Sequence, residues 1–340
     1  MTSSPSPAMK VDRLWVPLLT HYRKSGSLVE VDLERTAAHL SFIRPWVSQL
    51  LLAGSTGDGW EMRPEQLLDV LHLAEHKALR GGRFLVGALQ PTTDAVIERA
   101  QAIEDALQKA QRRTGEYCGL AVCPPVDAGA SQADILRHYR RVLDETRGPI
   151  AVYQLPQVTH CSIEPDTMRA IAEDPRVTMF KDTSGTDTVA ASGFDAVGLV
   201  RGAEGAYIEM LQPAGPYDGW LLSTGNAFGP LLRLMLDRLD AGDTERAAAL
   251  SDTMTRVVAE LFAEASKVPF GNPFSNANRA VDHLWAYGSG WREAPPPVTI
   301  SGRELPADLI AVALEHASGI LSLPEKGYLT TPSAAESFQR

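Results

Sequence analysis

The sequence predicts an α/β protein, namely a (β/α)8 barrel of the TIM type with a helical extension at its C-terminal end. Short apolar runs alternate with longer amphipathic segments, and eight such runs fall within about 230 residues. The runs are apolar almost throughout, which is typical of parallel strands covered on both faces. A doubly wound open sheet is the alternative arrangement for the same alternation.

The expected strands are rich in aliphatic residues that fit a buried sheet. They lie at residues 14–20, 49–54, 84–89, 118–123, 150–154, 177–182, 196–202 and 218–224. Between them, apolar residues at helical spacing predict helices such as 33–43, 64–79 and 94–111. Pro64 and Pro165 stand just inside two of the helical segments, where a missing N–H costs least.

After residue 240 the alternation stops. Segments 243–265 and 307–321 have helical spacing, and the proline-rich segment 291–302 separates them. We therefore divide the chain into a disordered N-terminal tail (1–10), a catalytic barrel (11–240), a helical region (241–323) and a polar tail (324–340).

Charge and cysteine content narrow the class of protein. The net charge of −10 argues against a nucleic-acid partner, because phosphate binding needs a basic surface. The chain has an odd number of cysteines, Cys118, Cys123 and Cys161, which favours a reducing compartment. No apolar run approaches the length of a membrane span, and residues 1–10 lack the apolar core of a signal peptide. We expect a cytoplasmic protein without a membrane partner.

Polar residues cluster where the predicted strands end. In a parallel barrel, catalytic side chains come from these C-terminal ends and the loops that follow. The sequence places GSTGDG (54–59), Tyr153, Lys181, Glu204 and Ser223 there. Each has an ordinary structural explanation by itself: a turn, a packed ring or a solvated charge. Their convergence on one barrel mouth favours a functional site.

Five motifs in order carry a resemblance to a known family. They are GSTGD, YQLP (153–156), KDTSG (181–185), STGN (223–226) and GNPF (271–274). Lys181 follows Tyr153 by 181 − 153 = 28 residues, the spacing that this family uses. Over roughly residues 11–290 the chain resembles the class I, Schiff-base-forming aldolases of the dihydrodipicolinate synthase and N-acetylneuraminate lyase family.

The resemblance implies a homotetramer built as a dimer of dimers, and it implies catalytic roles. Lys181 would form an imine with pyruvate or another 2-oxo acid, and Tyr153 would move protons above that carbon. Ser55 and Thr56 would hold the substrate carboxylate. The chemistry is consistent with these roles, because a lysine amine attacks a carbonyl only when neutral and burial lowers its pKa. The iminium supplies the positive charge, so no metal and no other cofactor is expected.

Departures from the family pattern concern the second substrate. Val158 stands where the synthase branch has an arginine, and Pro125 and Val126 replace its tyrosine pair. These changes remove a carboxylate clamp and a proton relay, and they suggest an apolar or bulky aldehyde. Similarity is closer to the lyase branch, where residues matching a further set would contact the hydroxyls of the aldehyde half: Thr183, Glu204 and Ser223.

The leading hypothesis is a pyruvate-dependent class I aldolase, a carbon–carbon lyase that makes or cleaves a 4-hydroxy-2-oxo acid. A Schiff-base dehydratase, hydratase-aldolase or synthase of the same family is the first alternative. The alternative from another class is a non-catalytic paralogue that binds 2-oxo acids. The presence of both Lys181 and Tyr153 favours an enzyme.

Overall fold

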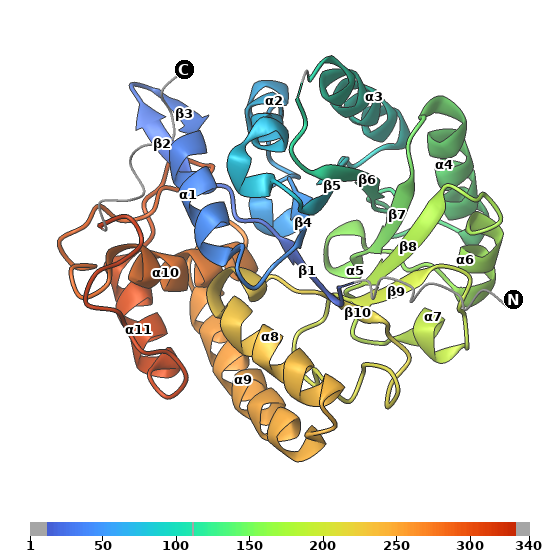
Figure 1. Cartoon of the computed structure of the whole chain (residues 1–340). Coiled ribbons are helices and arrows are strands. Elements are labelled where there is room, and N and C mark those ends of the chain that lie inside the picture. The colour runs from blue at the N-terminus through green and yellow to red at the C-terminus, as the bar shows by residue number, and fades with distance from the viewer. Residues whose placement is uncertain (1–11, 111, 331–340) are drawn as a thin grey trace, which may run out of the picture.

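The computed structural model describes residues 12–110 and 112–330, and the tail expected at 1–10 lies outside this part of the chain. Eight parallel strands close into a barrel in the order β1-β10-β9-β8-β7-β6-β5-β4 (Figure 1). Their bounds are β1 Leu14–Pro17, β4 Gln49–Leu52, β5 Arg83–Gly87, β6 Glu116–Val122, β7 Ile150–Gln154, β8 Val177–Asp182, β9 Gly198–Arg201 and β10 Gly219–Leu221. The predicted barrel is confirmed, since the sheet closes on itself.

The longer helices that follow the strands surround the barrel, and the short α5 lies at the cavity end of the barrel (Figure 1). They are α1 Leu33–Ile43, α2 Pro64–Leu71, α3 Thr93–Lys109, α4 Gln132–Glu145, α5 Pro156–Thr159, α6 Pro165–Ile171, α7 Thr188–Ala191 and α8 Gly225–Asp240. The three-residue turn η1 (Ser55–Gly57) follows β4. A short antiparallel hairpin of β2 (Tyr22–Ser25) and β3 (Leu28–Val31) stands outside the barrel, and the sequence did not predict it.

The helix expected over 64–79 is broken into three pieces: α2, then η2 (His72–Glu75) and η3 (Lys77–Leu79). Helical spacing alone favoured one helix, but tertiary hydrogen bonds replace those of a continuous helix. The Thr114 hydroxyl donates to the carbonyls of Ala74 and His76, which are 3.2 and 2.7 Å away. His76 is extended, with ψ of 138°, so the helix ends before it.

Three C-terminal helices pack beside the barrel: α9 Thr244–Ala265, α10 Pro273–Tyr287 and α11 Ala307–Ala317 (Figure 1). The sequence predicted α9 and α11 but not α10. Residues 324–330, assigned to the polar tail, pack onto this region. The Tyr328 ring stacks on Phe42 with 4.7 Å between centroids, and its hydroxyl donates to Asp282 at 2.8 Å. Among the described residues, no helix combines the length and apolar character needed to span a membrane.

Side chains fill the barrel interior in two layers. The lower layer is apolar and comes from seven strands: Trp15, Leu51, Leu85, Ala121, Ala151, Val200 and Leu221. Above it, towards the carboxyl ends of the strands, Leu89, Cys123, Tyr153 and Leu155 form a smaller cluster. The lower layer closes the barrel, and the upper layer forms a dry base for the cavity above.

Candidate active site

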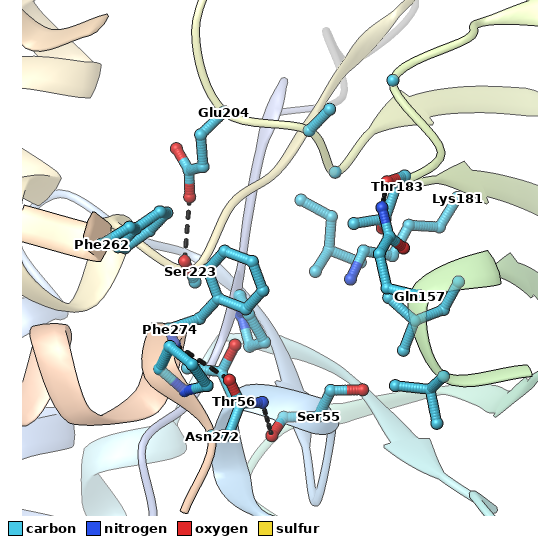
Figure 2. Close-up of a pocket in the computed structure, with 18 of the residues that line it drawn as sticks. Ser55, Thr56, Gln157, Lys181, Thr183, Glu204, Ser223, Phe262, Asn272 and Phe274 are labelled. Carbon is cyan, nitrogen blue, oxygen red and sulfur yellow. Dashed lines mark hydrogen bonds between the residues drawn. The ribbon is translucent and has the colours of Figure 1, made fainter. Parts of the chain in front are cut away.

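A cavity of about 710 Å³ opens at the carboxyl ends of the strands. Its walls come from the residues after β4, β7, β8, β9 and β10, and from α9 and the beginning of α10 (Figure 2). All seven site residues that the sequence predicted line this one cavity: Ser55, Thr56, Tyr153, Lys181, Thr183, Glu204 and Ser223. The structure therefore brings together residues that are up to 168 positions apart (223 − 55).

Lys181 lies near the end of β8 at the base of the cavity, with 5 % of its surface exposed. The register of β7 and β8 sets it beside Tyr153, and its Nζ lies 3.7 Å from the centroid of the Tyr153 ring. Burial lowers the pKa of Lys181 to about 7, although the negative charge of Glu204 acts in the opposite direction. A substantial fraction of this amine is therefore neutral near pH 7 and able to act as a nucleophile.

Tyr153 connects Lys181 to the loop after β4. Its hydroxyl donates to Ser55 Oγ at 3.4 Å, and Trp60 Nε1 donates to the same oxygen at 3.0 Å. Because Ser55 Oγ accepts both bonds, its own proton is left to donate into the cavity. Burial raises the pKa of the Tyr153 phenol, so the phenol is protonated at neutral pH.

Thr183 contributes a buried hydroxyl close to the Tyr153 phenol, where it acts to lower the pKa of that phenol against the larger effect of burial. Its main-chain N–H donates to the Gln154 carbonyl at 3.0 Å, and its carbonyl accepts from Gln157 Nε2 at 2.9 Å. Its Oγ1 atom is buried without a hydrogen-bond partner. A buried hydroxyl without a regular hydrogen bond is costly, and this one lines the cavity.

Glu204 and Ser223 contact each other. The Ser223 hydroxyl and the Thr224 N–H donate to one carboxylate oxygen at 2.9 and 3.1 Å. The hydroxyls of Thr224 and Tyr207 donate to the other oxygen at 2.7 and 3.0 Å. Burial raises the pKa of Glu204, and these hydrogen bonds counteract the shift. With four donors of the protein already on it, this carboxylate has little capacity left for a ligand.

The start of α10 holds the loop after β4 in place. Asn272 Nδ2 donates to the Ser55 carbonyl at 3.2 Å, and the Ser275 hydroxyl donates to the Thr56 carbonyl at 2.9 Å. Asp58 in the same loop forms a buried ion pair with Arg279 of α10. Anchoring both carbonyls on the α10 side fixes the orientation of these peptide groups at the cavity.

Sequence reasoning missed several residues of the site. Asn272 and Phe274 belong to the GNPF motif, which was noticed but given no role. Trp60 and Phe262 carried no signal, because aromatic residues at such positions usually serve packing. Gly202 is needed for space: a Cβ atom there would lie 2.4 Å from Thr183 Oγ1 and 2.7 Å from Lys181 Cε.

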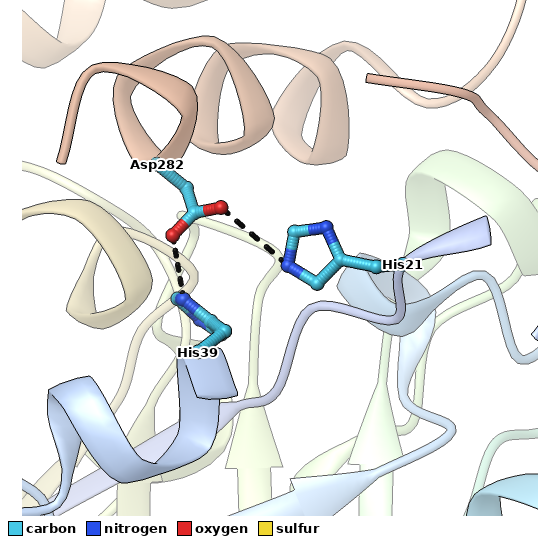
Figure 3. Close-up of side chains that lie close together, drawn as sticks. All are labelled: His21, His39 and Asp282. Carbon is cyan, nitrogen blue, oxygen red and sulfur yellow. Dashed lines mark hydrogen bonds and ion pairs between the residues drawn. The ribbon is translucent and has the colours of Figure 1, made fainter. Parts of the chain in front are cut away.

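A second polar cluster lies outside this cavity (Figure 3). His21, His39 and Asp282 bring possible metal-ligating atoms within 4.8 Å of one another. However, the atoms of Asp282 and His39 that could bind a metal already contact other protein groups. Asp282 accepts from His39 Nδ1 at 2.7 Å and pairs with Arg35 Nη2 at 2.6 Å, while His39 Nε2 lies 3.0 Å from Asn226 Oδ1. A dication would compete with the Arg35 guanidinium, so we interpret the cluster as an ion-pair network that ties α1 to α10.

The closed barrel and its lysine-centred cavity define a (β/α)8 protein with a site typical of imine-forming enzymes. The sequence profile described as the dihydrodipicolinate synthetase family matches residues 10–272, and the chain belongs to this family. The 4-hydroxy-tetrahydrodipicolinate synthase of Anaplasma marginale (strain St. Maries) is 30% identical over 272 residues, covering 77% of this chain and 83% of the relative.

Solved structures agree with the fold. YagE, a prophage protein of the dihydrodipicolinic acid synthase family from E. coli K12 solved with pyruvate, has a TM-score of 0.72 at 19% identity, covering 90% of this chain and 97% of its own. CdNal from Clostridium difficile, solved with mannosamine, has a TM-score of 0.72 at 14% identity, covering 91% and 98%. The relative from Anaplasma marginale is named a synthase, whereas CdNal was solved with mannosamine. The closer similarity of this chain to the lyase branch therefore stays a prediction.

Proposed function

We propose that the protein is a class I aldolase that forms a Schiff base between Lys181 and pyruvate or another 2-oxo acid. The observation that carries the proposal is the buried Lys181 amine, whose pKa is lowered to about 7 at the base of the cavity beside Tyr153. A buried lysine without a close ion-pair partner destabilises a fold, which favours a chemical role for the amine.

The first step is attack on the 2-oxo carbon. The neutral Lys181 amine adds to the carbonyl, water leaves, and a protonated imine forms. In this proposal the Ser55 hydroxyl and the N–H groups that begin η1 hold the carboxylate, with Thr56 beside them. Support comes from the free Ser55 proton and from the position of both residues at the cavity. In the cleavage direction the C3–C4 bond then breaks, and its electron pair moves into the iminium to leave an enamine and an aldehyde.

Proton movement is assigned to Tyr153. Its hydroxyl contacts Ser55 Oγ, and its ring lies against Lys181 Nζ. As the bond breaks, the phenol oxygen accepts the proton of the C4 hydroxyl while the phenol passes its own proton to C3, so Tyr153 stays neutral. Protonation of C3 converts the enamine into the imine of pyruvate, and hydrolysis of this imine releases pyruvate and the free Lys181 amine. In this proposal Thr183 Oγ1, a buried hydroxyl close to the Tyr153 phenol, holds the C4 oxygen during this transfer. General acid–base catalysis of this kind contributes roughly 10²–10⁴-fold.

Reductive trapping tests the proposal. The protein is incubated with pyruvate and borohydride, and the intact mass is measured. We expect an addition of pyruvic acid less one oxygen, which Lys181→Ala abolishes and the exposed-lysine control Lys267→Ala retains. A parent chain that gains no mass would overturn the assignment of Lys181.

Tyr153→Phe separates imine formation from turnover. We expect trapping to persist in part, while the cleavage or condensation rate falls by roughly 10²–10⁴-fold because the proton carrier is gone. Equal turnover in the variant and the parent would remove Tyr153 from the mechanism.

The condensation named for the curated relatives is the second candidate. Its support is the sequence similarity, but the cavity differs from what a carboxylate-bearing acceptor needs. Among the described residues that line it, Lys181 is the only lysine and arginine is absent.

A further inference from the structure

The part of the cavity away from Lys181 has an apolar wall. Figure 2 shows Phe262 of α9 and Phe274 of α10 across the cavity from the Lys181 side chain. The two rings pack edge to face, with 4.7 Å between centroids and 82° between planes. Val258 of α9 and Val158 of α5 also line the cavity. Val158 and Trp60 pack against the Tyr153 cluster, so apolar side chains line the cavity on the Tyr153 side as well as at the two rings.

Phe274 is not packed as a core residue would be. It is 42% exposed and lines the cavity, so much of its ring faces open space. Covering apolar surface is worth about 25 cal/mol per Å², so a ligand that covers this ring gains affinity. The Trp60 indole also lines the cavity and is oriented by its hydrogen bond to Ser55 Oγ.

Charge in the cavity favours an uncharged ligand at this wall. The charged side chains that line it, within the described residues, are Lys181, Glu61 and Glu204. Lys181 is consumed by the imine, and Glu204 already accepts four hydrogen bonds. A second carboxylate on the ligand would meet two acidic side chains and no free cation, an unfavourable arrangement in a partly dry site.

We propose that the aldehyde half of the substrate is an uncharged aryl or bulky alkyl group that packs against Trp60, Phe262 and Phe274. The inference rests on the proposed aldolase function and names its substrate class. In the synthetic direction, pyruvate and an aldehyde RCHO give R–CH(OH)–CH2–CO–COO⁻. One C–C bond forms between pyruvate C3 and the aldehyde carbon, a C3 proton ends on the new hydroxyl, and no oxidant or reductant is needed. Cavities of this size bind molecules of such dimensions.

The test compares trapping of three 2-oxo acids on Lys181: pyruvate, 4-phenyl-2-oxobutanoate and 2-oxoglutarate. We expect the phenyl compound to be trapped at least about tenfold more efficiently than 2-oxoglutarate, which corresponds to about 1.4 kcal/mol. Failure of all three would reject the proposed function itself. Trapping of pyruvate together with a preference for 2-oxoglutarate would reject only the apolar subsite.

A variant pair then locates the subsite. Phe274→Lys adds a cation to the apolar wall at an exposed position, so we expect the phenyl-to-2-oxoglutarate ratio to fall by about tenfold or more. Leu234→Lys is the matched control, because Leu234 is 38% exposed on α8 and does not line the cavity. An unchanged ratio in Phe274→Lys would contradict the assignment of this wall. Turnover of pyruvate with benzaldehyde, compared with succinic semialdehyde, gives the same comparison for the full reaction.

Discussion

Lys181 and Asp282 are both buried ionisable side chains, yet the protein surrounds them in opposite ways. Asp282 has the Arg35 guanidinium and His39 in contact, and Tyr328 also donates to it. Burial acts to raise the pKa of Asp282, but Arg35 and His39 hold it well below its usual range. Lys181 has an aromatic ring beside it, and burial lowers its pKa to about 7. The partner, and not the depth of burial, decides whether a buried group stays charged.

The difference separates a stabilising cluster from a reactive one. The Asp282 network joins α1, α8 and the C-terminal helices, and each charge in it is compensated. The Lys181 amine is uncompensated, which costs stability and makes the nitrogen a nucleophile. Natural sites often combine lower stability with function in this way.

Removing the Lys181 amine should have the largest effect of the changes that test this comparison. Lys181→Met keeps the apolar stem and deletes the nitrogen. We expect turnover to fall by more than about 10⁴-fold, because the imine cannot form. The melting temperature at pH 7 should stay the same or rise, since a buried amine is removed. A turnover assay measures the first effect and calorimetry the second, while trapping checks that no imine forms. A large drop in melting temperature would show that Lys181 is structural.

Removing the Asp282 carboxylate tests the structural role of the buried ion-pair network. Asp282→Asn leaves Arg35 buried without its ion-pair partner, so we expect the free energy of unfolding to fall by about 3–5 kcal/mol. Glu304→Gln, which breaks the exposed pair with Lys24, serves as control and should cost at most about 1 kcal/mol. Denaturant unfolding gives both numbers. Equal costs in the two variants would contradict a structural role for the buried network.

Gly202→Ala crowds the reactive cluster without removing a functional group. The new methyl group would displace Lys181 Cε and Thr183 Oγ1, so we expect pyruvate trapping to slow by about 10–100-fold. Overpacking of this size costs about 1–3 kcal/mol of stability. Gly319→Ala is the control, because an added Cβ there meets nothing within 4 Å. Unchanged trapping in Gly202→Ala would mean that the lysine has room to move.

The pH dependence of stability separates the two residues by the pH range in which it changes, because the contributions of both residues to the free energy of unfolding rise with pH. Lys181 has a folded pKa of about 7 and an unfolded pKa of about 10.4, so the unfolded chain binds more protons between these values. Its contribution to the free energy of unfolding therefore rises with pH across this range, and trapping rises through about pH 7. The contribution of Asp282 is complete above about pH 4 and falls below it. The free energy of unfolding is measured across pH for the parent, Lys181→Met and Asp282→Asn. A variant whose profile runs parallel to that of the parent would contradict the role given to the residue that it lacks.

Much of the barrel could be predicted from the sequence because its signals are local. The strands β7 and β8 begin and end where the apolar runs do, and α1 matches its amphipathic segment. Lys181 and Tyr153 could be singled out because strand ends and motif spacing are visible along the chain. Their common cavity follows from the geometry of parallel strands, whose carboxyl ends meet at one side of the barrel.

Helix α10 could not be predicted, because its polar residues are buried. Four of its polar residues are each at most 1% exposed: Asn276, Arg279, Asp282 and His283. The segment therefore does not show the division into a buried apolar face and an exposed polar face that marks an amphipathic helix. Burial of such side chains depends on partners from distant segments, among them Asp58 and Arg35. A partner from a distant segment also explains the broken helix over 64–79, where Thr114 donates to the carbonyls of Ala74 and His76.

The sequence by itself determined the barrel, its lysine and its tyrosine, since apolar periodicity and motif spacing are properties of neighbouring residues. Only the tertiary structure decided what surrounds them. It set Tyr153 under the amine, saturated Glu204 with donors, left Thr183 Oγ1 without a partner and brought Phe262 and Phe274 to the cavity. The physical reason is that pKa, hydrogen-bond satisfaction and pocket polarity depend on contacts between residues far apart in the chain.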